Sequence, residues 1–147
     1  MQDHTELWRD ATRIVHESGA GVLATVGADH QPHATWMGGV GAKNGLDEVL
    51  TITAPHTRKV SNLRENPRAE WMFSSPTKET IVYLSGPTEL ITQSPECDDL
   101  WEEIPNKSQA YFLKYYEVAK GFAVIRTKVE RVEVVKPLVF KKIVLRE

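Results

Sequence analysis

The chain has 147 residues and a mass of 16.6 kDa; 41% of its residues are hydrophobic and 26% are charged. These values favour one soluble globular domain over residues 1–147 and exclude a collagen, a coiled coil and a fully disordered chain. The formal net charge is −2 and there is one cysteine, so a disulfide framework is excluded and the molecule as a whole lacks the positive charge of a nucleic-acid binder.

The first expected element is an N-terminal helix over about residues 4–18, because apolar residues recur at helical spacing and Gly19-Ala20-Gly21 follows. A second, short helix fits residues 57–65, since the chain then meets Asn66-Pro67. A helical insertion rich in aromatic residues is expected over about 95–118. Period-two patterns and turn residues predict six strands. Their ranges are 22–26, 33–37, 49–53, 69–74, 80–92 and 122–135.

Two of the expected strands carry signs of a bend. Gly86-Pro87 interrupts the fifth, and glycine or proline inside a strand marks a bend or a close approach. In the sixth, the apolar positions change parity between Val129 and Val132, which requires a bulge or a bend. Bent antiparallel strands with peripheral helices predict a mainly β, α+β protein built on a small closed barrel.

The most informative stretch runs from a strand end into a helix start, over residues 51–59. Thr57 is a suitable N-cap, and Arg58 and Lys59 then occupy the first helical turn. Cations are unfavourable there because the helix dipole is positive at that end. A bound phosphate would remove the conflict through free N–H groups, the Thr57 hydroxyl and two cations. Two side chains that simply extend into water fit the charge pattern equally well.

A second stretch, residues 31–39, places Trp36 and Met37 in a strand that ends in Gly38-Gly39. Glycines there permit the close approach of a flat ligand or of another chain. Taken alone, the segment is more typical of core packing followed by a flexible strand end.

Together these segments resemble the pyridoxamine 5'-phosphate oxidase-like split barrel, and within it the short, general-stress-protein branch. The resemblance covers about residues 20–92, and the order of elements continues it to about 135. The segments that carry it are Gly21-Val22-Leu23-Ala24-Thr25-Val26, Gln31-Pro32-His33, Thr57-Arg58-Lys59, Leu63-Arg64-Glu65-Asn66-Pro67-Arg68 and Leu84-Ser85-Gly86-Pro87-Thr88-Glu89-Leu90.

The resemblance implies a six-stranded antiparallel split barrel that forms a homodimer and binds FMN at the subunit interface. Arg58 and Lys59 would hold the FMN phosphate, with a hydroxyl or backbone donor from Thr57. Ile52 and Thr53 would lie against the ribityl chain and the flavin ring. The other side of the ring would be lined, largely through backbone groups, by His33, Ala34, Thr35 and Trp36.

The chain departs from the true oxidases of this family at the substrate site. They carry an arginine and a lysine on the second strand, where this chain has Thr35, Trp36, Met37 and Gly38. They also carry a glutamine where Ile81 stands, and a C-terminal Arg-x-His motif that is missing here. The resemblance therefore extends to FMN and not to the vitamin B6 reaction.

The sequence thus predicts an FMN-binding oxidoreductase of unknown substrate. The alternatives are a flavin-binding stress-response protein without catalysis, and a split barrel that binds haem or a deazaflavin. No general acid or base is assigned; His33 is the first candidate and His56 the second. His30 and His33 lie across a turn and His56 could come near them, but no Cys or carboxylate stands at ligand spacing with these three, so no metal site is expected. No apolar run suits a membrane span and the polar start does not suit a signal peptide, so a cytoplasmic protein is expected. With a net charge of −2, no nucleic-acid partner is expected, and no membrane partner either.

Overall fold

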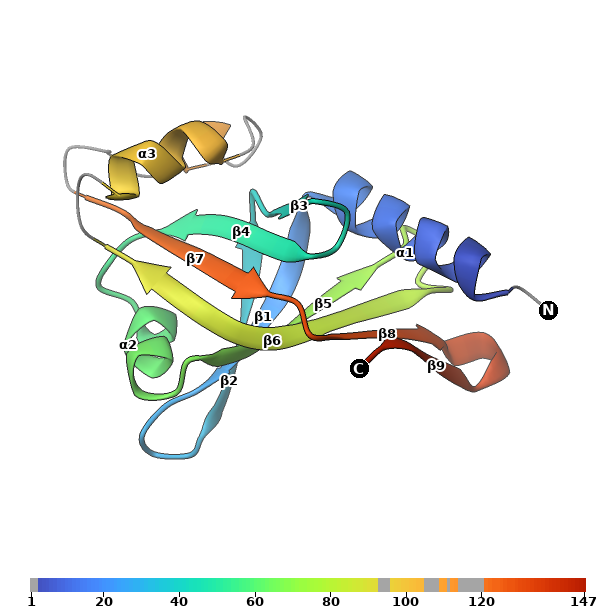
Figure 1. The fold of residues 1–147 in the computed structure, drawn as a ribbon. Coiled ribbons are helices and arrows are strands. Elements are labelled where there is room, and N and C mark those ends of the chain that lie inside the picture. The colour runs from blue at the N-terminus through green and yellow to red at the C-terminus, as the bar shows by residue number, and fades with distance from the viewer. Residues whose placement is uncertain (1–2, 93–95, 105–108, 111, 114–120) are drawn as a thin grey trace.

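The structure is a computed structural model that describes residues 3–92, 96–104, 109–110, 112–113 and 121–147, and strands dominate it (Figure 1). In chain order the elements are α1 (His4–Ser18), β1 (Ala20–Val26), β2 (Pro32–Gly38), β3 (Gly41–Lys43), β4 (Glu48–Thr53), α2 (Arg58–Glu65), β5 (Arg68–Ser74), β6 (Ile81–Ile91), α3 (Glu96–Glu103), β7 (Ala123–Lys128), β8 (Arg131–Lys136), the 3₁₀ turn Pro137–Val139 and β9 (Lys141–Arg146).

Helix α1 confirms the helix predicted over residues 4–18. Asp3 caps it, because its Oδ1 accepts a hydrogen bond of 2.9 Å from the Glu6 N–H. Gly19 ends it in the left-handed conformation, with φ 61°. Its buried stripe consists of Leu7, Ala11, Ile14 and Val15, and this stripe attaches the helix to the sheet.

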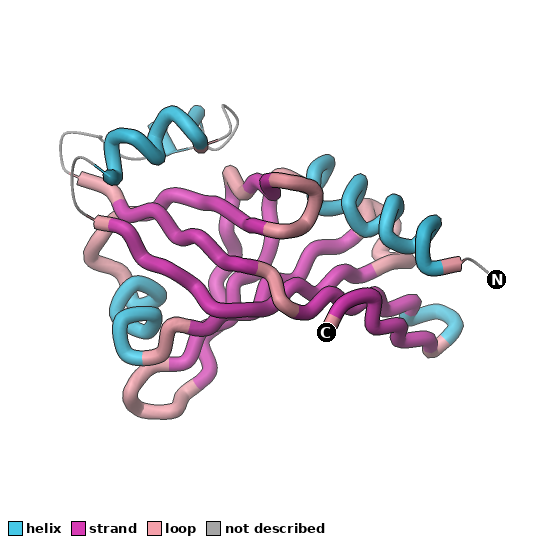
Figure 2. The backbone as a smooth tube through the Cα atoms, in the orientation of Figure 1, coloured by secondary structure: helices cyan, strands magenta, loops and turns pink. Residues whose placement is uncertain are grey.

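All strand pairs are antiparallel, in the order β2-β1-β5-β6-β7-β4-β3, and β8 pairs with both β6 and β9. The sheet curls (Figure 2), and the Thr51 hydroxyl of β4 donates to the Gly39 carbonyl just beyond β2, at 3.4 Å. Strands far apart in the sheet order therefore meet, and the curled half-barrel confirms the predicted mainly β split-barrel fold.

The six expected strands appear as β1, β2, β4, β5 and β6 and, for the last, as β7 and β8. The expectation of one continuous strand over 122–135 is wrong, because the ladder breaks at Val129 and Glu130. Their N–H groups donate to the carbonyls of Asp47 and Ser85, both at 2.9 Å. This break produces the parity change seen in the sequence.

The structure adds the short strand β3 and the C-terminal strand β9, which were not expected as separate strands. Helix α3 confirms the first part of the expected helical insertion at 95–118. Residues 105–108, 111 and 114–118 of that insertion lie outside the described residues.

Two hydrophobic clusters lie on opposite faces of the curled sheet. In the barrel interior, Trp71 and Phe73 are stacked with ring centroids 5.9 Å apart. The second cluster lies between the sheet and α3. It contains Leu50, Ile52, Ile91, Leu100, Ile104, Phe112, Phe122 and Val124, with Trp101 against it. In β4, Val49 belongs to the interior cluster, whereas Leu50 and Ile52 belong to the cluster under α3. Neighbouring side chains of a strand point to opposite faces of the sheet, so this division is expected.

Strand β6 links the two halves of the sheet. Its first part pairs with β5 and β8, and from Thr88 onward it pairs with β7. The exchange of partners falls at Gly86-Pro87, which confirms the predicted bend. A Cβ at Gly86 would overlap the carbonyl oxygen of Lys128, so the crossing requires glycine.

Candidate functional site

Helix α2 begins with two cations and no acidic residue in its first turn. Thr57 occupies the N-cap position with extended backbone, as predicted, but its side chain makes no capping hydrogen bond. The hydroxyl instead makes a long contact of 3.5 Å with the Ala54 carbonyl. The first N–H groups of a helix have no partner within it, so donors are available here beside Arg58 and Lys59.

The two cations have different surroundings. Arg58 is about half exposed, and its Nη2 lies 3.8 Å from Oδ2 of Asp29 in the β1–β2 turn. Lys59 is partly buried, and the loss of water around its ammonium lowers the pKa of Lys59 from the usual lysine value. Within the described ranges, no carboxylate forms an ion pair with Lys59. An anion bound here would stabilise both side chains and the helix dipole.

Strand β4 leads directly into this helix start. Ile52 and Thr53 are 6% and 3% exposed, and the Ile52 side chain belongs to the cluster under α3. Strand β3 pairs only with residues 48–50. On the side of β4 that faces β3, none of the described strands pairs with residues 51–53, so the backbone groups on that side have no strand partner.

Strand β2 lies at the other end of the sheet order, and β1 is its one partner among the described strands. Thr25 and Leu23, which face the interior, are the β1 partners of His33 and Thr35. Ala34 and Trp36 therefore lie on the outer face, where Trp36 is 63% exposed. His33 and Thr35 thus face the interior, and Ala34 and Trp36 face outward. What the four residues have in common is their backbone, which lies at an edge of the described sheet.

Thr35 carries the one buried side-chain polar atom for which no hydrogen-bond partner is recorded among the described residues, its Oγ1. Buried polar groups are seldom left unpaired. A ligand that reached the inner side of β2 would supply the missing partner.

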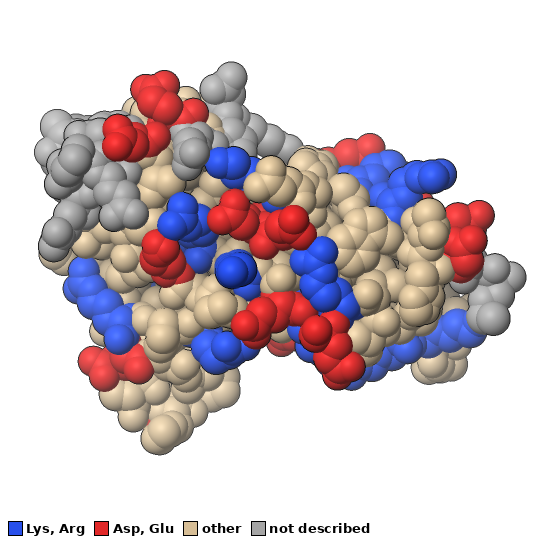
Figure 3. All heavy atoms as spheres, viewed as in Figure 1, with Lys and Arg blue, Asp and Glu red and all other residues tan. Residues whose placement is uncertain are grey.

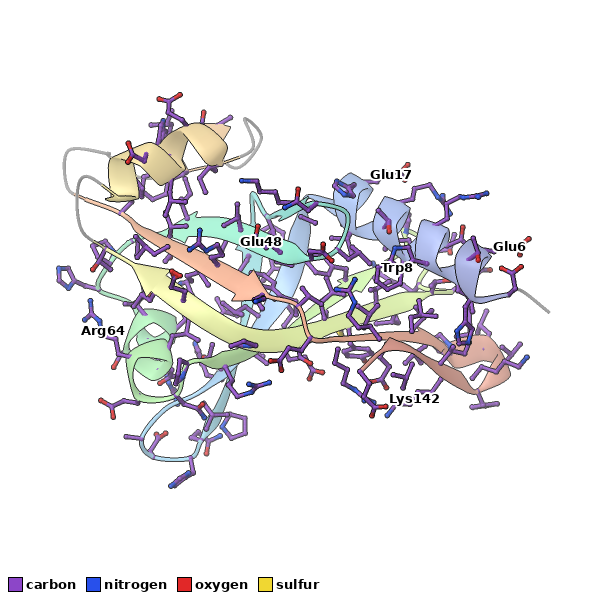
Figure 4. All side chains as sticks on the ribbon, viewed as in Figure 1. Glu6, Trp8, Glu17, Glu48, Arg64 and Lys142 are labelled. Atoms are coloured by element: carbon purple, nitrogen blue, oxygen red, sulfur yellow. The ribbon has the colours of Figure 1, made fainter. Side chains whose placement is uncertain are left out.

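Helix α2 is bound to the β1–β2 hairpin by a buried hydrogen bond. Asn62 Nδ2 donates to Thr25 Oγ1 at 3.1 Å, and Thr25 pairs with His33. The start of β2 therefore lies one strand away from α2. The predicted residues of β4 and α2 lie between Glu48, at the start of β4, and Arg64, in the last turn of α2; both are labelled in Figure 4. The structure thus brings the start of β2 to the end of the barrel where β4 leads into α2, whereas Trp36 lies at a cavity beside α1.

Sequence reasoning missed three residues of this region: Thr25, Asp29 and Asn62. Asn62 had a detectable signal, because a polar residue interrupts the buried stripe between Val60 and Leu63. Asp29 had none, since aspartate is common in turns for its own backbone contacts.

Two cavities in the described part of the chain lie away from α2. One, of about 860 Å³, lies between α1 and the β5–β6 turn and reaches Trp36. Another of about 860 Å³ lies over β4 and β7, where Arg126 binds Glu89 at 2.8 Å and Arg146 binds Asp47 at 2.9 Å. Positive and negative side chains intermingle over this face (Figure 3), so it carries no patch of a single sign.

Among the residues that the structure describes, no group of three His, Cys, Asp or Glu side chains is arranged to hold a metal ion. In the same residues, no helix is long and apolar enough to cross a membrane.

The chain is similar in structure to several solved proteins. A protein from Clostridium acetobutylicum related to general stress protein 26 matches with a TM-score of 0.76 and 18% identity, over 99% of this chain and 96% of that one. A pyridoxamine 5'-phosphate oxidase-related, FMN-binding protein from Nostoc punctiforme matches with a TM-score of 0.62 and 16% identity, over 90% and 81%. A haem-binding protein from Mycobacterium smegmatis matches with a TM-score of 0.72 and 20% identity, over 99% and 59%.

At these identities the structural matches show the fold alone, and no curated protein sequence matches the chain significantly. The sequence model of the family described as pyridoxamine 5'-phosphate oxidase matches residues 7–136, which is most of the chain. The chain therefore belongs to the pyridoxamine 5'-phosphate oxidase family.

Proposed function

We propose that this protein binds FMN and acts as a flavin-dependent oxidoreductase. The observation that carries the proposal is the start of α2, where Thr57, Arg58 and Lys59 form what we call the phosphate cradle. Lys59 is a partly buried cation with no carboxylate partner among the described residues, at a helix end that already favours anions. A phosphate monoester supplies the negative charge and the acceptor oxygens that this cradle lacks.

The rest of the site suits the remainder of FMN. The free backbone edges of β2 and of residues 51–53 offer N–H and C=O groups of the kind that bind the polar rim of a flavin. Thr35 Oγ1, buried and without a recorded partner in the described chain, needs a hydrogen bond that a ligand would provide. Ile52 would contribute through its backbone, because its side chain is packed under α3.

Bound FMN would supply the electron transfer, and the protein would position it and limit its access to water. His33 is partly buried on the inner face of β2 and is the residue we propose to hold or move a proton near the ring. The missing second-strand cations and Arg-x-His motif argue against pyridoxamine 5'-phosphate as the substrate.

We further propose a homodimer in the cytoplasm with one flavin site at each end of its interface. Neither of the two cavities described above is lined by a residue of the phosphate cradle, whereas good cofactor sites bury most of their ligand. A second copy, related by a twofold axis, would supply the missing wall.

Haem is the second candidate ligand, because the structure with a TM-score of 0.72 is that of a haem-binding protein. The cationic cradle accepts carboxylates as well as phosphates, so charge alone does not separate the two ligands. Flavin binding without catalysis is the third possibility.

The direct test is the visible spectrum of the purified protein, followed by titration with FMN, riboflavin and haem. We expect the two bands of oxidised flavin and tighter binding of FMN than of riboflavin. Light scattering should give twice the chain mass. A Soret band together with no affinity for FMN would favour haem instead.

The matched variants are Arg58→Ala and Lys59→Ala. Each should weaken FMN binding by about 1.5–3 kcal/mol, the range for a charge-assisted hydrogen bond, and should leave riboflavin binding and folding nearly unchanged. Unchanged FMN affinity in both variants would remove the cradle from the proposal.

A further inference from the structure

The β1–β2 turn places a carboxylate beside the phosphate cradle. Asp29 Oδ2 lies 3.8 Å from Arg58 Nη2, and both side chains are about half exposed, at 65% and 48%. Among the described residues, Asp29 is the acidic residue that pairs with Arg58. This carboxylate therefore pairs with a cation that the proposed phosphate would also use.

The position of this carboxylate is fixed by its own turn. Asp29 Oδ1 accepts a hydrogen bond of 3.0 Å from the Gln31 N–H, which is an Asx turn. The His30 N–H donates to the Gly27 carbonyl at 3.1 Å, and His30 has a positive φ of 61°. One carboxylate oxygen thus holds the turn and the other remains to face Arg58.

The turn is in its place because α2 and β1 are packed tightly where it begins. Asn62 Oδ1 occupies the space that a Cβ at Gly27 would need. The other end of the same amide binds Thr25. The close contact between Gly27 and Asn62 therefore holds the β1–β2 hairpin against α2. This packing places Asp29 of the turn near Arg58 at the start of the helix.

We infer that Asp29 is an internal anion that competes with the phosphate of the ligand for Arg58 and so limits the affinity of the cradle. The inference rests on the proposed FMN site. A pair 3.8 Å apart between exposed side chains is weak, so a dianionic phosphate can displace it. Asp29 would also repel that phosphate once bound, and both effects lower affinity for phosphorylated ligands alone.

The test is the variant Asp29→Asn, measured by flavin fluorescence with FMN and with riboflavin at low salt. Asparagine keeps the side-chain acceptor of the turn and loses the charge. We expect FMN to bind about threefold tighter, because an exposed pair of charges contributes only weakly, and riboflavin to bind as before. The gain should shrink as salt screens the charges.

The matched control is Asp10→Asn, which removes the same charge from another exposed pair, with Arg13 at 3.4 Å on α1. This variant should bind both flavins as the unmodified protein does. If Asp29→Asn and Asp10→Asn change FMN affinity equally, the effect is one of net charge and the inference is wrong.

The two proposals fail in different ways. If the unmodified protein prefers FMN to riboflavin and Asp29→Asn leaves that preference unchanged or reduces it, competition by Asp29 is excluded and the cradle stands. If the unmodified protein does not prefer FMN to riboflavin, the cradle itself is wrong, and the inference falls with it.

Discussion

Polar side chains have different surroundings in the barrel interior and at the phosphate cradle. In the interior, Trp71 Nε1 donates to Thr127 Oγ1 at 3.0 Å, and Thr127 shares a second hydrogen bond of 3.0 Å with Thr88. At the cradle end, neither the Lys59 ammonium nor Thr35 Oγ1 has a recorded partner within the described residues.

Paired polar groups in the interior contribute to stability, whereas unpaired ones at the cradle are available to a ligand. A buried donor that is already paired contributes to folding, and leaving it unpaired costs about 1–3 kcal/mol. A cation partly removed from water and left without a partner costs folding energy instead, and a ligand can recover it. Variants in the interior should therefore change stability and leave ligand binding unchanged, whereas variants at the cradle should change ligand binding far more than stability.

The largest expected effect is a loss of stability in the variant Gly86→Ala. The added Cβ would overlap the Lys128 carbonyl, and no rotamer change can relieve a clash with backbone. We expect the free energy of unfolding to fall by about 3 kcal/mol or more, the upper range for overpacking, as measured by urea denaturation. Gly45→Ala is the control, because nothing lies within 4 Å of its Cβ position, although its φ of 74° adds some strain. Equal losses in the two variants would contradict a crossing that requires glycine.

A smaller effect is expected from Thr127→Val, which keeps the shape of the side chain and removes its hydroxyl. The Trp71 indole N–H then loses its acceptor, and the Thr88 hydroxyl loses its contact with Thr127 while keeping its hydrogen bond to the Gly86 carbonyl. The free energy of unfolding should fall by about 1–3 kcal/mol, while the ratio of FMN to riboflavin affinity stays constant. A change in that ratio would mean that the interior and the cradle are coupled, and the comparison would have to be abandoned.

Local patterns predicted most of the fold. Period two located five of the six expected strands within one or two residues at each end, and the change of parity before Val132 signalled the break between β7 and β8. The short strand β3 was missed because three residues carry no measurable period. Strand β9 was not among the six expected strands, since alternation cannot locate the αL turn at Phe140, with φ 54°.

The candidate site was predicted less completely than the fold. The helix start at Thr57 and the cations after it were visible, because capping and charge are local properties. The side of β4 on which Ile52 packs was not, since it depends on α3, more than forty residues further along the chain. Asn62 and Thr25 are 37 positions apart, and no single-sequence pattern reports such a contact.

The smallest expected effect is a pH dependence that has opposite signs for folding and for binding. Burial lowers the pKa of Lys59, so between that lowered pKa and the usual lysine value the unfolded chain binds more protons than the folded one. The contribution of Lys59 to the free energy of unfolding therefore rises with pH in this window. FMN affinity should fall in the same window, because the phosphate loses its ammonium partner.

Two variants at position 59 isolate this dependence. Lys59→Arg should keep FMN affinity constant through the window, since a guanidinium stays protonated. Lys59→Met should bind FMN weakly at every pH. Below the window its free energy of unfolding should be about 0.3–1 kcal/mol higher than that of the unmodified protein, because a cation has been removed from the first turn of α2. Measurements of FMN affinity and of urea stability from pH 7 to pH 11 provide both curves. If the alkaline loss of FMN affinity persists unchanged in Lys59→Arg, another group titrates, and Lys59 does not hold the phosphate.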